Sequence, residues 1–279
     1  MKTEIDLNAY FDRIGYDGPR AATLDVLKKL HFLHPLAIAF ENLNPLLRIP
    51  VLLDSKSLQQ KLIYENRGGY CFEQNLLFMD VLRSLGFWAK GLAARVLWNV
   101  PEGRITPRGH MLILVEAESK KYICDVGFGG MVLTAPLLLE PVTAQETPHE
   151  PFKLTREGEE YILFTRIDGE WKALYRFNLS EHYREDYQLT NWYLSNHPES
   201  HFVTGLIAAR PDINPSRRYT LRGNQFSIHY LHGQTEKRTL ETVTELRQIL
   251  ERYFLIRLSD VPELDAVLQK IIVKMEGTA

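Results

Sequence analysis

The sequence contains few cysteines and no long apolar run. Only two cysteines occur among 279 residues, and no Cys-x-x-Cys spacing is present. This excludes a disulfide scaffold and is typical of a protein from a reducing compartment. No apolar stretch approaches the roughly 20 residues that span a bilayer, and the first residues, MKTEID, lack the apolar core of a signal peptide. We therefore expect a cytoplasmic protein that does not enter a membrane.

The sequence also lacks an excess of charge of one sign. Lys and Arg number 33, Asp and Glu number 35, and the net charge is −2. No basic run indicates nucleic-acid binding. His31 and His34 lie three residues apart in a predicted helix, but no Cys, Asp or Glu completes a metal-binding set beside them. We therefore expect neither a nucleic-acid partner nor a bound metal.

One of the two cysteines stands where a loop turns into a helix. Cys71 follows two glycines, Gly68 and Gly69, and apolar residues recur at helical spacing from Phe72 to Leu85. A helix N-terminus favours the thiolate, which is the nucleophilic form of cysteine. The glycines would allow a substrate to approach the sulfur closely. A free cysteine is more often a small apolar core residue, so this segment alone leaves both interpretations open.

A predicted hairpin supplies two partners for a nucleophile. The runs at 111–115 and 121–126 are rich in branched residues and flank a polar turn, which predicts a β-hairpin. With a turn centred near residue 118 or 119, the numbers of paired residues sum to about 236 to 238, so Asp125 lies beside or diagonal to His110. This geometry suits a carboxylate that orients an imidazole base. Cys124 alternates with Asp125 along the strand and is predicted to face the core.

The remaining pattern predicts an α+β protein in three regions. Residues 1–88 are predicted to be mainly helical, residues 89–195 to be mainly antiparallel strands in a small barrel or sandwich, and residues 196–279 to mix helices with a hairpin. The predicted helices lie at 22–32, 57–64, 72–85 and 202–209, with two amphipathic helices near the end of the chain, and the predicted strands lie at 92–100, 111–115, 121–126, 152–155, 161–167 and 171–177. Asp168-Gly169 is a strong hairpin signal.

Several separated blocks resemble one enzyme family. The order Arg-Gly-Gly-Tyr-Cys-Phe-Glu at 67–73, then His110, then Asp-Val-Gly-Phe-Gly at 125–129 is similar to that of the arylamine N-acetyltransferases. Further blocks at 10–16, 39–43 and 197–202 resemble the family too, so the resemblance covers at least residues 8–210. Several blocks in the right order are more specific than one short motif.

The sequence departs from the family pattern at two positions. Ala39 stands where the family usually has proline, which we expect to change only the stiffness of a loop. Gly109 stands where the family often has threonine, so contacts with the acyl donor are expected to differ.

The resemblance implies a cysteine-protease-like triad and a two-step reaction. Cys71 would be the nucleophile, His110 its base and Asp125 the residue that orients the base. Acetyl-CoA, a co-substrate and not a permanently bound cofactor, would acylate Cys71. An arylamine, arylhydrazine or N-hydroxyarylamine would then take the acetyl group. The implied fold is an N-terminal helical bundle, a central antiparallel β-barrel and a C-terminal α/β lid.

Other residues receive roles by the same resemblance. It implies that Phe128 belongs to the acceptor pocket, with Phe202 as a further substrate-binding residue. Gly129 and Gly130 would let backbone amides approach the donor. Arg67 and Glu41 would either form a buried ion pair that supports the Cys71 loop or remain solvated charges.

Two alternative functions are compatible with the same residues. A cysteine hydrolase or a transglutaminase-type acyl transferase also has Cys, His and Asp in this order. A binding protein could keep the pocket without turnover. The family blocks outside the triad favour acetyl transfer over hydrolysis, and the intact Cys71, His110 and Asp125 disfavour a binding protein.

Overall fold

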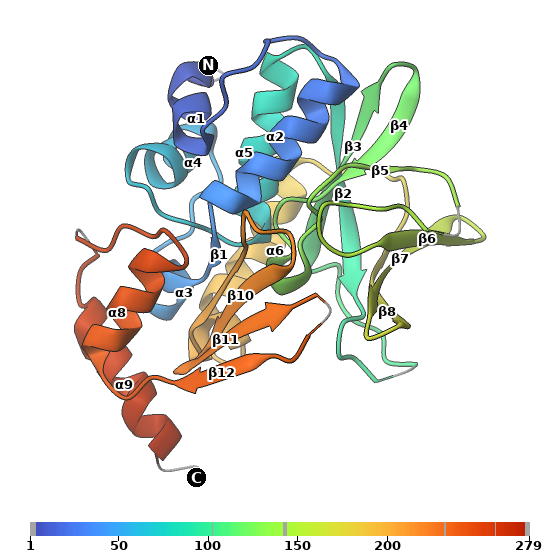
Figure 1. Cartoon of the computed structure of the whole chain (residues 1–279). Coiled ribbons are helices and arrows are strands. Elements are labelled where there is room, and N and C mark those ends of the chain that lie inside the picture. Colours follow the sequence, from blue (N-terminus) through green and yellow to red (C-terminus); the bar gives the residue numbers. More distant parts are fainter. Residues whose placement is uncertain (1–3, 102, 142–143, 232, 260, 277–279) are drawn as a thin grey trace.

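Helices form the N-terminal part of the chain, at the top left of Figure 1. The computed structural model describes residues 4–276, apart from 102, 142–143, 232 and 260. The N-terminal elements are α1 (Leu7–Ile14), α2 (Leu24–Ala37), the short strand β1 (Phe40–Glu41), α3 (Leu43–Leu46), α4 (Ser55–Gln59), a π-helical turn η1 (Gln60–Tyr64) and α5 (Cys71–Ser84). The helix predicted at 22–32 therefore extends to Ala37, and the one predicted at 57–64 is an α-helical turn followed by a π-helical turn.

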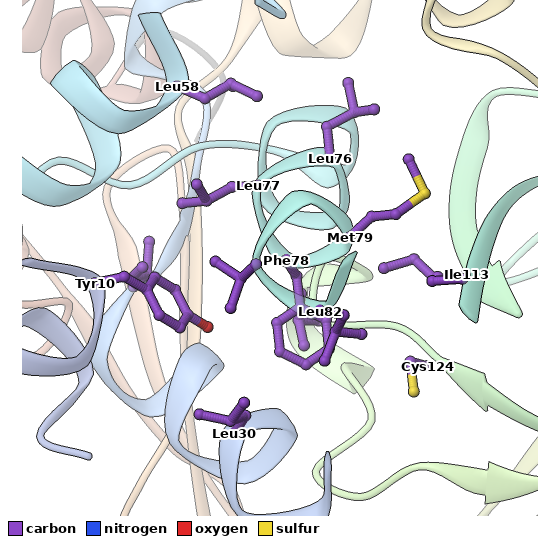
Figure 2. Close-up of a cluster of buried hydrophobic side chains, with 14 of the residues drawn as sticks. Tyr10, Leu30, Leu58, Leu76, Leu77, Phe78, Met79, Leu82, Ile113 and Cys124 are labelled. Carbon is purple, nitrogen blue, oxygen red and sulfur yellow. The ribbon is translucent and has the colours of Figure 1, made fainter. Parts of the chain in front are cut away.

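The helix α5 is the centre of this part, and every residue from Cys71 to Met79 is buried. Figure 2 shows Tyr10, Leu30 and Leu58 on one side of α5, with Ile113 and Cys124 on the opposite side. A helix segment that is buried round its whole circumference needs neighbours on every face, and here other helices and a sheet supply them. Cys124 is fully buried, which confirms its predicted place in the core.

The central part is a seven-stranded antiparallel sheet with the strand order β5-β4-β3-β2-β8-β7-β6. Its strands are β2 (Trp88–Val96), β3 (His110–Ala117), β4 (Lys120–Cys124), β5 (Leu137–Leu138), β6 (Phe152–Glu157), β7 (Glu160–Ile167) and β8 (Glu170–Phe177). The first strand begins and ends four residues earlier than the predicted 92–100. The pair Ile113–Cys124 confirms the predicted hairpin register, and Asp168 and Gly169 form the turn between β7 and β8.

One glutamine connects the two edges of this sheet. The Gln145 side chain accepts a hydrogen bond from the Leu138 amide at 2.8 Å and donates one to the Leu138 carbonyl at 2.9 Å. Its backbone forms a two-way bridge with Phe152, the first residue of β6. The sheet is therefore nearly closed into a barrel, which confirms the barrel of the predicted fold.

The C-terminal part contains a second sheet, with the strand order β1-β9-β10-β11-β12. The elements that follow the barrel along the chain are α6 (Arg184–Asn196), α7 (His201–Thr204), β9 (Ile207–Pro211), β10 (Arg217–Arg222), β11 (Gln225–Tyr230), β12 (Glu236–Thr239), α8 (Val243–Arg252) and α9 (Leu264–Glu276). The α+β class with a helical start, an antiparallel barrel and a C-terminal α/β region is thus confirmed.

The helix predicted at 202–209 is wrong beyond its first turn. The chain leaves α7 at Gly205 and enters β9, which pairs with β1 through Phe40–Ala209 and with β10 through Leu221–Ala208. The partner strand β1 lies about 170 residues earlier, so no local sequence pattern predicts this pairing.

The sequence prediction also missed α6, which packs against the N-terminal helices. Asn191 donates a hydrogen bond to the Val51 carbonyl at 2.9 Å, and Arg184 pairs with Asp80 of α5 at 2.8 Å. Within the described residues, no helix combines the length and the apolar character needed to cross a bilayer.

Candidate active site

Cys71 is the first residue of α5 and is 4% exposed. The Tyr70 amide just before it donates a hydrogen bond to the Glu73 carboxylate at 3.1 Å, which is one half of a capping box. The Lys61 ammonium lies 2.7 Å from the other oxygen of Glu73. The start of the helix is therefore fixed by side-chain contacts, and Cys71 belongs to the first turn, whose backbone amides have no partner within the helix.

Two glycines allow the chain to close around Cys71. A Cβ atom on Gly68 would lie 2.2 Å from the Ala39 carbonyl oxygen, and one on Gly127 would lie 2.9 Å from the Cα of Cys71. Gly127 therefore lets the end of the hairpin touch the start of α5. The space beside Gly68 is filled by the protein itself and is not left for a substrate, so the predicted reason for this glycine is wrong.

The three residues predicted as a triad lie together at this contact. The His110 Nε2 is 2.7 Å from the Asp125 Oδ2, and the two residues are 3% and 0% exposed. The Cys71 Sγ lies 3.8 Å from the carbonyl oxygen of Gly109, the residue before His110. The helix thus supplies the thiol and the barrel supplies the imidazole and the carboxylate.

The electrostatics of the pair favour the imidazolium. Burial acts to lower the pKa of His110, but the Asp125 carboxylate and hydrogen bonds with Asp125 and Cys71 outweigh it and raise the pKa to about 10. Burial acts to raise the pKa of Asp125, but His110 and its hydrogen-bond donors lower it. At neutral pH the ring is therefore a cation held between the Asp125 carboxylate and the Cys71 sulfur.

Asn75 holds the end of the hairpin against α5 and was missed by the sequence prediction. Its amide group donates to the Asp125 Oδ1 at 3.0 Å and to the Met111 carbonyl at 2.8 Å, and its oxygen accepts from the Val126 amide at 3.0 Å. Asn75 lies four residues after Cys71, on the same face of the helix. That spacing is the signal that could have identified it.

An aromatic wall borders the imidazole. The Phe128 ring lies 5.0 Å from the His110 ring and 5.1 Å from the Tyr175 ring, and Tyr175 in turn lies 5.0 Å from His110. Phe128 thus lies where the sequence placed it, beside the triad. Tyr175 comes from β8, and no motif in the sequence marks it.

Phe202 lies against Tyr70, the residue just before the nucleophile. Its ring contacts Phe40 at 6.1 Å and Tyr70 at 5.3 Å, between centroids. Phe40 also lies against Gly129, whose Cβ would be 3.7 Å from the Phe40 ring and whose φ is +81°. Phe40 therefore connects the predicted site residues, although the sequence prediction gave it no role.

Gly130 packs against the C-terminal sheet. A Cβ atom at this position would lie 3.4 Å from the Thr220 Cγ2 of β10. Gly129 and Gly130 belong to the short 3₁₀ turn η2 (Gly129–Met131), which follows the end of the hairpin.

Arg67 and Glu41 form a buried ion pair. The Arg67 Nη2 is 2.8 Å from the Glu41 Oε1 and donates a second hydrogen bond to the Asn44 side chain at 3.1 Å. Burial acts to raise the pKa of Glu41, but the Arg67 guanidinium outweighs it and lowers the pKa. Between the two sequence alternatives, the structure shows the pair and not the solvated charges.

The described part of the chain contains no group of three or more His, Cys, Asp or Glu side chains placed to hold a metal ion. Cys71 and Cys124 are both free.

Known proteins are similar to this chain in both sequence and fold. A family model described as N-acetyltransferase matches residues 23–262. The arylamine N-acetyltransferase of Escherichia coli is 40% identical over 91% of this chain and 90% of its own length. An enzyme of Salmonella typhimurium, named arylamine N-acetyltransferase / N-hydroxyarylamine O-acetyltransferase, is 38% identical over 91% of this chain and 90% of its own.

A solved structure supports the same relationship. The arylamine N-acetyltransferase of Mycobacterium marinum, determined in complex with CoA, superposes with a TM-score of 0.91 at 41% identity and covers 95% of this chain and 99% of its own. Together with the matching family model, these similarities show that the chain belongs to the arylamine N-acetyltransferase family.

Proposed function

We propose that this protein transfers an acetyl group from acetyl-CoA to arylamines, arylhydrazines and N-hydroxyarylamines through a thioester on Cys71. The observation that carries this proposal is the contact of the sulfur at a helix N-terminus with an imidazolium held by a buried carboxylate. The relatives are named for arylamine and N-hydroxyarylamine acceptors, and the Mycobacterium marinum enzyme was determined in complex with CoA.

In the first half-reaction the Cys71 thiolate, paired with the His110 imidazolium, attacks the acetyl carbonyl carbon. A new carbon–sulfur bond forms to Cys71, and the carbon–sulfur bond to CoA breaks. His110 gives its proton to the departing CoA sulfur, so free CoA leaves as a thiol and the imidazole becomes neutral. The backbone amide of Cys71 is the proposed donor to the oxyanion.

In the second half-reaction the acceptor nitrogen attacks the thioester. The neutral His110 takes a proton from the nitrogen, and the Cys71 sulfur leaves as the thiolate beside the restored imidazolium. A thioester is exchanged for an amide, which makes this step favourable. Asp125 keeps the imidazole in one orientation through both steps.

The substrate-binding roles follow from position. Phe128 lies against His110 and Phe202 lies against Tyr70, the residue before Cys71, so both rings are available to contact a planar aromatic acceptor near the triad. Gly129 and Gly130 place backbone groups at the junction of barrel and C-terminal sheet, where the donor would lie. Phe40, in contact with both groups, is added to this set.

Supporting and organisational roles complete the proposal. The Arg67–Glu41 pair holds the loop before Cys71, because the Glu41 amide bonds to the Gly69 carbonyl at 3.1 Å.

We keep the division into residues 1–88, 89–195 and 196–279 as a proposed domain organisation. The free thiols of Cys71 and Cys124 support a cytoplasmic location.

The test is intact-mass analysis with acetyl-CoA alone, followed by addition of an arylamine or a hydrazine. We expect one acetyl adduct on Cys71, no adduct on Cys71→Ala, and discharge by the amine with formation of acetylated product. An adduct lost to water equally fast without amine would favour the hydrolase alternative. Absence of an adduct from the folded wild-type protein would favour a binding protein.

A further inference from the structure

One buried histidine bonds to the main chain of the triad and has no role in the proposed reaction. His31 lies on α2 and is fully buried. Its Nε2 accepts a hydrogen bond from the backbone amide of Asp125 at 3.1 Å. The carboxylate of the same Asp125 holds His110 at 2.7 Å. A side chain from the helical part therefore fixes the main chain of the residue that orients the imidazole.

The sheet itself does not fix this point of the chain. The ladder between β3 and β4 ends with the pair Ile113–Cys124, so Asp125 is the first residue beyond it. The Asp125 amide points to His31 instead of to a strand carbonyl. The His31 ring thus accepts the hydrogen bond of the Asp125 amide, whereas the residues before Asp125 bond to carbonyls of a neighbouring strand.

The hydrogen bond also defines the protonation of the ring. An imidazole nitrogen that accepts a hydrogen bond carries no proton, so the single proton of the neutral His31 ring lies on Nδ1. Among the described residues this Nδ1 has no hydrogen-bond partner, although it is buried. A buried donor without a partner is unfavourable for stability, so packing alone does not account for a histidine here.

His34, one turn further along α2, differs in this respect. Its two nitrogens bond to the Tyr10 hydroxyl at 2.8 Å and the Gln74 side-chain oxygen at 2.7 Å, and neither contacts the triad. Both rings are held neutral because burial lowers the pKa of His31 to about 4 and that of His34 to about 3. Of these two histidines, His31 has one ring nitrogen without a hydrogen-bond partner, and its other ring nitrogen bonds to a proposed catalytic residue.

We propose that His31 is a positioning residue for acetyl transfer, which holds the Asp125 main chain so that the carboxylate stays aligned with His110. The inference rests on the proposed role of Asp125. His31 touches neither substrate nor reacting atoms, and it acts only through Asp125. Loss of its acceptor lets the hairpin end shift, which weakens the pairing that stabilises the imidazolium beside Cys71.

The test compares His31→Met with His31→Gln. The two side chains have similar length, but only glutamine offers an oxygen near the position of Nε2. We expect His31→Met to lower kcat by roughly ten- to a hundredfold with little change in KM, and His31→Gln to recover most of the loss. Leu30→Ala, a core substitution on the same helix, is the control for lost stability, because Leu30 is fully buried.

A second readout separates positioning from simple destabilisation. The rate of alkylation of Cys71 by iodoacetamide is measured against pH, with the modified peptide identified by mass. We expect alkylation at neutral pH to be slower in His31→Met and to stay unchanged in His31→Gln and Leu30→Ala. Equal profiles and equal kcat values for Met and Gln variants of matched melting temperature would overturn the proposal.

A measurement on the unmodified protein covers the case in which His31→Met does not fold. Nitrogen-15 correlation spectra of histidine rings report which nitrogen carries the proton, and we expect His31 to carry it on Nδ1. A proton on Nε2 contradicts the proposal. If Asp125→Asn keeps full activity, the proposed role of Asp125 fails; if Asp125→Asn is inactive but His31→Met is normal, only the inference about His31 fails.

Discussion

At the scale of single residues, substitution of Asp125 is the most direct test of the proposed mechanism. Asp125→Asn keeps the size of the side chain but replaces one accepting oxygen with a donor, so it no longer stabilises a protonated His110. We expect acetyl transfer to fall by about 10⁴-fold, as in comparable serine triads. Single-turnover acetylation of Cys71 measures the loss. A near-normal rate in the folded variant would make Asp125 a structural residue.

His110 also links the site to stability. Its pKa is raised from an ordinary value of 6.5 to about 10, so folding favours the protonated ring. This contribution is fully present below pH 6.5 and is lost as the pH rises through about 10. We expect the urea midpoint of the wild type to fall over this range more steeply than that of His110→Gln. If the urea midpoints of the two proteins change in parallel with pH, the raised pKa of His110 is contradicted.

At the scale of elements, the contact between α5 and the hairpin depends on Gly127. A methyl group there would lie 2.9 Å from the Cys71 Cα and from the Asn75 Nδ2, and backbone atoms cannot give way easily. We expect Gly127→Ala to lower the free energy of unfolding by about 1–3 kcal/mol and to slow acetylation of Cys71.

Gly109→Ala is the matched control for this substitution. Its Cβ would meet only the Pro107 oxygen, at 3.9 Å, so we expect the free energy of unfolding to change by no more than about 0.5 kcal/mol. Urea unfolding measures both variants. Equal losses would show that the close approach at Gly127 is not what makes a glycine necessary there.

The elements that could be predicted from sequence are those with a strong local period. Alternation and turn chemistry indicate the hairpin register, so the proximity of His110 and Asp125 follows from local pattern, and helical spacing indicates α5. That Cys71 joins these two residues is implied only by the family resemblance. The strand β9 could not be found, because residues 202–209 read as a helix and its partner β1 is distant in sequence.

The supporting residues escaped the sequence prediction for a related reason. Asn75 and His31 act on Asp125 through tertiary hydrogen bonds, and neither stands in a motif that indicates its partner. Phe40 and Tyr175 reach the site from β1 and β8 by packing alone. Motif order identifies residues that do chemistry, while residues that position them depend on the assembled fold.

At the scale of the whole molecule, the site lies where all three parts meet. The helical part supplies Cys71, the barrel supplies His110 and Asp125, and the C-terminal part supplies Phe202. The pairing of β1 with β9 places the C-terminal sheet against the helices, and η2 packs on β9 and β10. The position of the C-terminal part relative to the barrel therefore affects the proposed substrate pocket directly.

A buried ion pair connects the barrel to the C-terminal sheet. Arg218 of β10 donates from Nε to Glu150 at 2.7 Å and from Nη2 to the Val132 carbonyl at 3.0 Å. The two charged residues are 3% and 6% exposed. Burial acts to raise the pKa of Glu150, but Arg218 lowers it, so the carboxylate is charged at neutral pH.

Removing one partner leaves the other charge buried without compensation. We expect Arg218→Met to lower the free energy of unfolding by about 3–5 kcal/mol, and the double variant Arg218→Met, Glu150→Leu to recover a large part of that loss, because it removes the stranded carboxylate. Urea unfolding followed by tryptophan fluorescence measures both. If the double variant is no more stable than Arg218→Met, then lost packing and the freed Val132 carbonyl, and not the uncompensated charge, dominate the loss at this junction.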